Sequence, residues 1–368
     1  MNKKIRVGIL GATGLVGQNC CQLLANHPWF EVVDVAASPN SAAKKYVDAV
    51  EDRWYMASDI PKGLASLTVR NVQDMDAIPE SIACFFSAMD LPQKEDTRQL
   101  EFAYAQTGYA LISNSSANRT MEDVPMIIPE INPHHSEVIT IQQSIRGLPE
   151  TGFVAVKPNC SIQSYLVTLT ALAQAGYPVE KVQVTTLQAL SGAGYIGLSN
   201  PDWKENVIPF ISGEEQKTEQ EPLKILGSIS DTGILPAEGP IISAVCTRVP
   251  VIDGHTAVVH LSFRKDVPDL ETIKNVWRQF KAEPQALNLP MAPKQPIIYL
   301  EDENRPQPKL DRDIDKGMAV SVGRLEKDTF FDIRFVALSH NIVRGAAGGA
   351  ILTAELLVQK GYIKSPEK

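Results

Sequence analysis

The sequence lacks the features of a metal-binding, secreted or nucleic-acid-binding protein. Only 5 of its 368 residues are cysteine and none has a CxxC partner, which argues against zinc and dithiol redox sites. The odd cysteine count, without a signal peptide or a long apolar run, predicts a cytoplasmic protein. With a formal net charge of −8 and no basic run, we expect neither nucleic acid nor a membrane as a partner. Repeats and low-complexity tracts are absent, and the length predicts two domains.

The first part of the chain has the pattern of a βαβ unit. Residues 4–10 predict a buried strand, a helical pattern follows, and residues 31–37 predict a second strand. Gly11, Gly14 and Gly17 lie between the first strand and the helix, in a variant of the dinucleotide fingerprint. Glycines at these points permit a tight turn and the close approach of a pyrophosphate to a helix N-terminus. A purely structural turn is the alternative, and the strand–helix–strand context favours dinucleotide binding.

The residues after the second strand bear on the choice between NADP and NAD. An NAD site places Asp or Glu at the strand end, where this chain has Ser38, and Asp34 comes a few residues too early. The hydroxyls of Ser38 and Ser41, with Lys44 or Lys45 beyond them, could hold a 2′-phosphate. The lysines could equally be solvated surface charges. The sequence therefore favours NADP.

Cys160 is the candidate nucleophile. It follows an apolar run at residues 153–156 and precedes a helical pattern over residues 162–172, so we expect it at a helix N-terminus with Ser161 as a cap. Free N–H groups and the positive end of the helix dipole would favour the thiolate, which is the nucleophilic form. A buried cysteine that only packs is the alternative.

A nucleophilic cysteine needs a proton acceptor, and His255 is one candidate. It follows Asp253-Gly254, which predicts a hairpin turn before a strand over residues 257–263. Arg248 lies nearby in sequence and could bind an anion. A histidine after a turn is more often structural, and spacing alone does not favour His255 over His260.

A series of motifs then points to one family: 11–14 (GATG), 113–119 (SNSSANR), 128–132 (IPEIN), 158–161 (PNCS), 188–194 (QALSGAG), 213–217 (GEEQK), Arg248 with His255, 305–312 (RPQPKLDR) and 341–348 (NIVRGAAG). Together they resemble the aspartate-semialdehyde dehydrogenases, in the archaeal and fungal branch. The resemblance runs in order from residue 4 to about residue 360. Lys157 departs from it, because the family usually has a small or amide residue there.

The resemblance implies a reaction. The family reduces β-aspartyl phosphate with NADPH to aspartate β-semialdehyde and phosphate, in the biosynthesis of lysine, threonine and methionine. By this likeness Cys160 forms a thioester, with its own N–H steadying the oxyanion, His255 is the acid/base, and Gln188 orients the acyl intermediate. No metal is implied.

The resemblance also implies binding roles. Glu214 would take the substrate ammonium, Arg248 its carboxylate, and Arg119 and Lys217 its phosphate, with Asn159 also near the substrate. Without the resemblance, Glu214 and Lys217 would read as a surface pair at i,i+3 spacing, and Arg119 as a loop charge. The expected cofactor-binding residues are Gly11, Thr13, Gly14, Leu15, Val16, Ser38, Ser41, Ser87, Ser191, Gly192 and Asn341.

The expected fold is α/β, similar to the architecture of glyceraldehyde-3-phosphate dehydrogenase. A Rossmann-like NADP-binding domain would span residues 1–156 and be completed by a C-terminal helix in 341–368. A mixed α/β catalytic and dimerisation domain would span 157–340, with strands at 182–189, 241–248, 256–264 and 330–337. One face of its sheet would meet a second subunit, in a homodimer or homotetramer.

Three other functions stay open. A malonyl-CoA or succinyl-CoA reductase of the same superfamily would keep the Cys/His chemistry, although malonyl-CoA has no ammonium to pair with Glu214. An N-acetyl-glutamyl-phosphate reductase has an acylated nitrogen that would not require this carboxylate. A non-catalytic NADP-sensing homologue is disfavoured by intact Cys160, His255 and Arg248.

Overall fold

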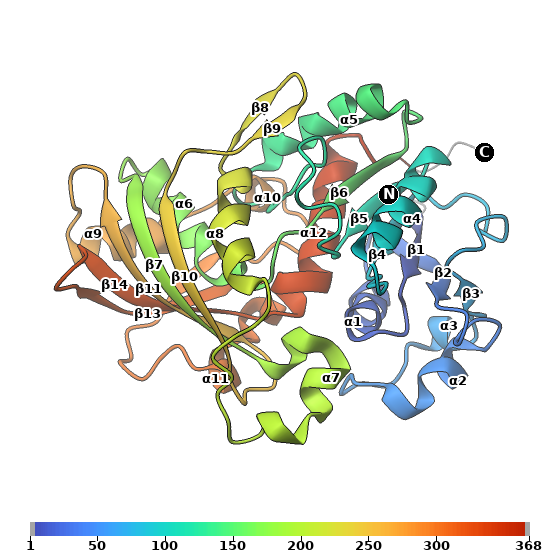
Figure 1. The fold of residues 1–368 in the computed structure, drawn as a ribbon, viewed down its shortest axis with the longest axis horizontal. Helices are drawn as coiled ribbons and strands as arrows, with labels where there is room; N and C mark the ends of the chain where they lie inside the picture. Colours follow the sequence, from blue (N-terminus) through green and yellow to red (C-terminus); the bar gives the residue numbers. More distant parts are fainter. Residues whose placement is uncertain (1–3, 365–368) are drawn as a thin grey trace.

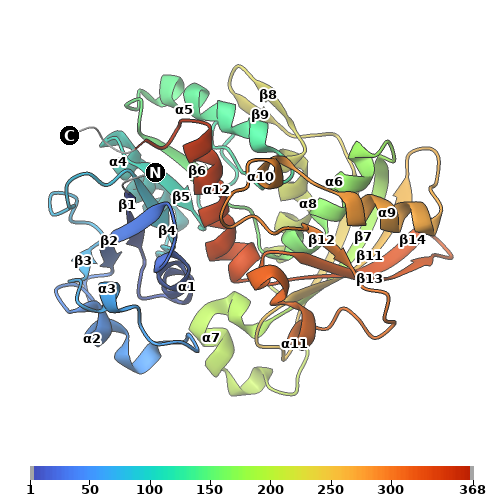
Figure 2. The ribbon, with the colours of Figure 1, turned by 180° about the vertical axis from the view of Figure 1, so that it is seen from behind.

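The computed structural model describes residues 4–364, in which two six-stranded sheets lie side by side with helix α12 (Gly348–Gln359) running between them (Figures 1 and 2). The expected α/β fold with a Rossmann-like part and a second mixed sheet is confirmed. Residues 1–3 and 365–368, which belong to the expected domain ends, lie outside the described part.

The first sheet is parallel throughout and has the order β3-β2-β1-β4-β5-β6. Its strands are β1 (Ile5–Leu10), β2 (Phe30–Ala37), β3 (Arg70–Asn71), β4 (Cys84–Ser87), β5 (Ala110–Ser113) and β6 (Phe153–Val156). Strands β4, β5 and β6 are buried along their whole length, as expected for a parallel sheet covered on both faces. The helices of this part are α1 (Leu15–Leu24), α2 (Tyr46–Val50), α3 (Lys62–Ala65), α4 (Lys94–Gln106) and α5 (Val138–Arg146).

The second sheet is mixed and has the order β10-β7-β11-β14-β13-β12. Its strands are β7 (Val179–Gln188), β10 (Ile241–Arg248), β11 (His255–Phe263), β12 (Ile297–Tyr299), β13 (Val320–Lys327) and β14 (Ile333–Ser339), and a separate hairpin pairs β8 (Ser228–Ser230) with β9 (Gly233–Leu235). The accompanying helices are α6 (Leu166–Gln174), α7 (Gly194–Ser199), α8 (Glu214–Ile225), α9 (Leu270–Gln279), α10 (Glu283–Ala286) and α11 (Pro308–Asp311).

Two sequence expectations about this sheet are wrong. Asp253-Gly254 makes a turn, with Gly254 at φ +104°, but not a hairpin, because β10 and β11 lie on opposite sides of β7. The last expected strand begins at Ile333 rather than at Phe330. Phe330 is 93% exposed, and its N–H donates to the Asp328 carboxylate in a turn before the strand.

The C-terminal segment returns to the first sheet. A π-helical turn at Val343–Ala347 leads into α12, which is apolar and buried on almost every side. Its side chains pack in one cluster with Cys20 and Leu24 of α1 and Ile112 of β5. A helix that is apolar all round requires such burial, and here it joins the two ends of the chain.

Candidate active site

Cys160 lies directly after β6, where the chain leaves the carboxyl end of the first sheet. The expected α-helix does not begin here, because a 3₁₀ turn at Ser161–Ser164 precedes α6. Ser161 is not the cap. The Asn159 Oδ1 accepts from the Ser161 N–H at 2.7 Å and from its hydroxyl at 2.6 Å, so Asn159 caps the turn.

His255 meets the nucleophile from the first residue of β11. The distance from Cys160 Sγ to His255 Nε2 is 3.3 Å, and the ring is fully buried. The Ala189 N–H donates to Nδ1 at 3.0 Å, which assigns the remaining ring proton to Nε2. His255 is therefore a neutral donor toward the sulfur, and His260 lies elsewhere, beside Asp328 at 2.9 Å.

The pKa shifts of the pair favour an uncharged thiol and imidazole in the free protein rather than the expected thiolate. Burial and the nearby Glu214 carboxylate raise the pKa of Cys160 above its ordinary value. Burial and the Arg248 guanidinium lower the pKa of His255 to about 3. The short 3₁₀ turn provides no long helix whose dipole could offset this desolvation.

Arg248 is held beside His255 by the same backbone residue. Its Nη1 donates to the Ala189 carbonyl at 2.8 Å, so the backbone of one residue holds both side chains. A Cβ at Gly192 would lie 2.8 Å from Arg248 Nη1 and 3.0 Å from His255 Cε1, and glycine avoids both clashes. The backbone of Gly192 thus packs directly against the side chains of His255 and Arg248.

Glu214 is a buried acceptor in the same site, not one member of a surface pair. Its Oε2 accepts from Asn159 Nδ2 at 2.9 Å and from Gln188 Nε2 at 3.0 Å, and its Oε1 pairs with Lys217 Nζ at 2.6 Å. Burial raises its pKa, but the Lys217 ammonium and these hydrogen bonds outweigh burial and lower the pKa to about 2. The site thus keeps a negative charge at neutral pH.

Arg119 and Lys217 line a common cavity of about 370 Å³. Arg119 Nη1 pairs with Glu221 at 3.0 Å and its Nη2 donates to the Asn114 carbonyl at 2.9 Å. Lys224 also lines this cavity, but its ammonium already donates to three backbone carbonyls, including that of Arg119 at 2.8 Å. Arg119 and Lys217, together with Lys94 on the same lining, are consequently the cations that an anion in this cavity would meet.

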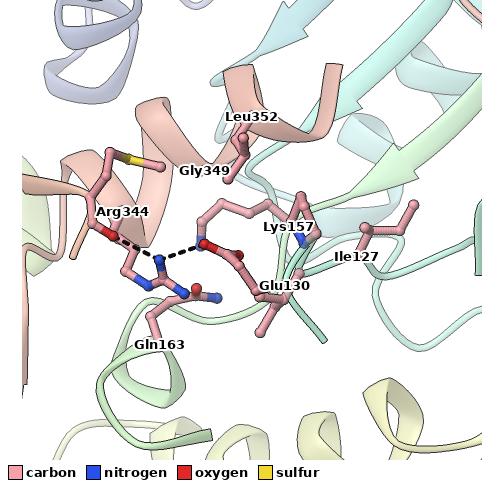
Figure 3. A pocket seen from close by; sticks show the side chains of 10 residues that line it. Ile127, Glu130, Lys157, Gln163, Arg344, Gly349 and Leu352 are labelled. Atoms are coloured by element: carbon pink, nitrogen blue, oxygen red, sulfur yellow. Dashed lines mark hydrogen bonds and ion pairs between the residues drawn. The ribbon is translucent and has the colours of Figure 1, made fainter. Parts of the chain in front are cut away.

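Lys157 occupies a small buried cavity behind the nucleophile (Figure 3). Figure 3 shows it with Glu130, Gln163 and Arg344 among the lining residues. The cavity has a volume of about 10 Å³, enough for about one water molecule. Lys157 Nζ donates to the Pro158 carbonyl at 2.8 Å, and burial lowers its pKa to about 7. The residue that departs from the family pattern is thus an ionisable group at the base of the site.

The glycine loop has the geometry of a dinucleotide turn. Gly11 has φ +77°, and a Cβ on it would lie 2.5 Å from the Ala88 carbonyl oxygen, so only glycine fits. Gly14 is the N-cap of α1 and has no side chain, so the first turn, which begins with Leu15 and Val16, receives no hydrogen bond from a cap side chain. Thr13 is buried in this turn. An uncapped helix N-terminus suits a pyrophosphate.

The region after β2 contains a cation that sequence reasoning missed. Ser41 is buried and its Oγ accepts from Arg53 Nη2 at 3.0 Å, whereas Ser38 is exposed. Lys45 turns away and donates to the Ser66 carbonyl at 3.1 Å. No motif marks Arg53, because a contact between residues 41 and 53 depends on how the intervening loop folds. The bidentate pairing of Asp34 with Arg70, at 2.7 and 3.2 Å, removes that carboxylate from any ribose contact.

Two other expected cofactor residues have their side chains engaged by the protein. Ser87 donates to the buried carboxylate of Glu101 at 2.7 Å, and its carbonyl accepts from the Asn114 N–H at 2.9 Å. Ser191 accepts from Asn341 Nδ2 at 2.8 Å, and Asn341 Oδ1 accepts from the Gly254 N–H at 2.8 Å. Asn341 therefore connects the C-terminal segment to the turn that carries His255.

Within residues 4–364 no group of His, Cys, Asp or Glu side chains could hold a metal ion. Over the same range, no helix has the length and apolar character needed to cross a membrane.

Comparison with known proteins shows which family the chain matches. The family described as "Semialdehyde dehydrogenase, NAD binding domain" matches residues 6–139, and "Semialdehyde dehydrogenase, dimerisation domain" matches residues 169–344. Aspartate-semialdehyde dehydrogenase of Methanothermobacter thermautotrophicus is 41% identical over 96% of this chain and 99% of its own length. That of Aspergillus fumigatus is 41% identical over 98% and 99%.

The solved structures extend the likeness to three dimensions. Aspartate semialdehyde dehydrogenase from Candida albicans, determined with NADP, superposes with a TM-score of 0.87 at 37% identity, covering 98% of this chain and 100% of that one. Full-length identity near 40% with both archaeal and fungal relatives also confirms the expected branch. The chain belongs to the aspartate-semialdehyde dehydrogenase family.

Proposed function

We propose that this chain catalyses the aspartate-semialdehyde dehydrogenase reaction, the NADPH-dependent reduction of β-aspartyl phosphate to aspartate β-semialdehyde and phosphate. The biosynthesis of lysine, threonine and methionine is its expected setting. One observation carries the proposal: the buried Glu214 carboxylate accepts hydrogen bonds from Asn159 and Gln188, beside the Cys160–His255 pair. A fixed negative charge next to a nucleophile suits an acyl substrate that carries an ammonium group.

The substrate-binding roles follow from the charges around the nucleophile. Glu214 would take the α-ammonium and Arg248 the α-carboxylate, while Arg119 and Lys217 would hold the phosphate from the 370 Å³ cavity. Glu214 and Lys217 already form an ion pair at 2.6 Å. The substrate ammonium would therefore replace Lys217 on Glu214 or share Glu214 with it, and the phosphate would do the same with Glu214 on Lys217.

The residues present fit an NADP molecule. The Gly11 turn and the N-terminus of α1 suit the pyrophosphate, and Arg53 with Ser41 suits the 2′-phosphate. Ser38, Ser87, Ser191, Gly192 and Asn341 are the remaining expected contacts. A bound nicotinamide would supply the hydride that converts the thioester to the aldehyde.

The protein groups can be given balanced roles in the acyl transfer. Cys160 Sγ attacks the acyl carbon, the bond from that carbon to the phosphate oxygen breaks, and the thiol proton leaves with the phosphate. The Cys160 N–H lies between the N–H groups of Asn159 and Ser161, which already have acceptors, and it would stabilise the oxyanion. When the carbon–sulfur bond breaks, the sulfur would leave as a thiolate that accepts a hydrogen bond from His255 Nε2–H, and a proton taken up from solvent would restore the thiol. In this scheme His255 acts as a hydrogen-bond donor to the sulfur, which is one part of the expected acid/base role.

A homodimer or homotetramer in the cytoplasm completes the proposal. The match to a dimerisation domain supports association of copies of this chain. Strand β10, at the edge of the second sheet, exposes Ile241 at 64% and Val245 at 46%, an apolar surface that a second subunit would cover. We expect the domain division at residues 156/157 and 340/341 to separate cofactor binding from this association.

The test is an assay of the purified protein with aspartate β-semialdehyde, NADP and inorganic phosphate. We expect NADP reduction that depends on all three, and no oxidation of NADPH with malonyl-CoA. Turnover of malonyl-CoA without phosphate-dependent use of the semialdehyde would contradict the proposal, because the substrate would then be a CoA thioester.

A further inference from the structure

Helix α8 holds the nucleophile segment, residues 159–161, through one face. Glu214, Thr218 and Glu221 are spaced by four and three residues and therefore share that face. Glu214 accepts from the Asn159 side chain at 2.9 Å, and the Thr218 hydroxyl lies 3.2 Å from that of Ser161. Glu221 Oε2 accepts from the Asn159 N–H at 2.5 Å. Three successive contacts from one helix thus fix the residues on both sides of Cys160.

A proline in the same helix adds a fourth contact. Pro222 has no N–H, so the carbonyl of Thr218, four residues earlier, lacks its usual i+4 partner in the helix. The hydroxyl of Tyr165, which immediately precedes α6, donates to this carbonyl at 3.2 Å. The missing helix bond is therefore replaced by a bond to the segment that follows the nucleophile.

Glu221 also reaches the cavity assigned to phosphate. Its Oε1 pairs with Arg119 Nη1 at 3.0 Å, and the two side chains are only 8% and 11% exposed. Arg119 is fixed from its other side by the Asn114 carbonyl. One carboxylate thus has one oxygen on the cation that faces the cavity and the other on the backbone next to Cys160.

We propose that Glu221 is a positioning residue, which holds the phosphate-binding guanidinium of Arg119 at a fixed position relative to the Cys160 sulfur. The proposal rests on the proposed function for the identity of the anion, but the fixing of the nucleophile segment is independent of it. Geometry of this kind matters because an acyl phosphate reacts only when its phosphate and its carbon are both in place.

The test is Glu221→Gln, which keeps an amide oxygen for the Asn159 N–H but removes the charge that orients Arg119. In phosphate-dependent NADP reduction we expect KM for phosphate to rise about tenfold or more, with KM for NADP and Tm nearly unchanged. The rate of Cys160 alkylation by iodoacetamide should change about threefold or more, because the Asn159 contact is weakened. The control is Glu219→Gln, whose Oε1 accepts from the Ala244 N–H at 3.0 Å and so faces β10; it should stay within about twofold of the parent.

A double variant covers the case in which a buried Arg119 without its partner prevents folding. Arg119→Met with Glu221→Gln removes both charges, and we expect a folded protein with the altered alkylation rate of the single variant. Parent-like phosphate kinetics and alkylation in Glu221→Gln would overturn the proposal, as would loss of folded protein in both variants. A parent protein that fails to use aspartate semialdehyde would instead contradict the proposed function, and the alkylation comparison would still decide whether Glu221 positions the nucleophile segment.

Discussion

Alkylation of Cys160 across a range of pH tests whether the free protein contains a thiolate. The structure pairs Sγ with His255 Nε2 at 3.3 Å, but the Ala189 N–H occupies Nδ1. An imidazolium would need a proton on both ring nitrogens, and the one on Nδ1 would face another N–H donor. We therefore expect a neutral thiol beside a neutral imidazole until substrate binds.

The size of the effect follows from the two pKa directions. The pKa of His255 falls from 6.5 to about 3, and that of Cys160 is raised above 9.0. Moving the thiol proton to the imidazole would cost about 8 kcal/mol on this difference, and the attraction between the two charges formed would return part of it. Even half of that cost would leave only about one ion pair in a thousand molecules.

The assay measures the rate of iodoacetamide labelling between pH 6 and 9.5, with the labelled residue identified by peptide mapping. The other four cysteines are buried and serve as internal references. We expect the logarithm of the Cys160 rate to rise with about unit slope over this range, and the same shape for His255→Ala, since only the thiolate reacts. A rate plateau below pH 7 in the parent, lost in His255→Ala, would refute the reasoning, because it would reveal a thiolate–imidazolium pair.

Four further predictions concern individual residues. Cys160→Ser should nearly abolish turnover while leaving NADP affinity intact, since serine is a weaker nucleophile and a poorer leaving group; substantial residual activity in steady-state kinetics would exclude Cys160 as the nucleophile. The parent should prefer NADP to NAD by kcat/KM, and Arg53→Ala should reduce that ratio about tenfold or more by removing a charged contact to the 2′-phosphate; an unchanged ratio would exclude the contact. Glu214→Gln should lower kcat/KM for the semialdehyde by about 1.5–3 kcal/mol, the range for hydrogen bonds to charged groups, with NADP affinity unaltered; semialdehyde kinetics like those of the parent would mean that the ammonium lies elsewhere. The pKa of Lys157 is about 7 in the folded protein, below the 10.5 of an unperturbed lysine, so the folded state binds fewer protons than the unfolded state between these two values. The free energy of unfolding should therefore rise with pH in that window, by at most about 1.4 kcal/mol per pH unit. Denaturant titrations at pH 7 to 10 should show a smaller rise of this free energy with pH for Lys157→Gln, and an equal rise would contradict the assignment.

Much of the fold could be read from local patterns. The βαβ unit followed from apolar runs and glycine spacing, because burial of a strand and the tight turn after it constrain the sequence directly. Cys160 stood out for a similar reason: it lies where an apolar strand gives way to a helical pattern. The match of motifs in chain order to one family supplied the remaining assignments, including His255, which spacing alone did not separate from His260.

Only the tertiary structure decided the electrostatics of the site and the partners of each charge. A helical i,i+3 pattern does not indicate whether Glu214 faces solvent or the nucleophile. In the folded chain Glu214 is buried and accepts hydrogen bonds from Asn159 and Gln188. The contact between Glu221 and Arg119 spans 102 residues, and no sequence period encodes such a contact. The protonation states of Cys160 and His255 likewise depend on how much water the packed chain excludes and on which N–H meets Nδ1. Local sequence determined which residue types stand at strand ends and turns, whereas burial and long-range pairing, which set the charge of those residues, exist only once the two sheets and α12 have packed together.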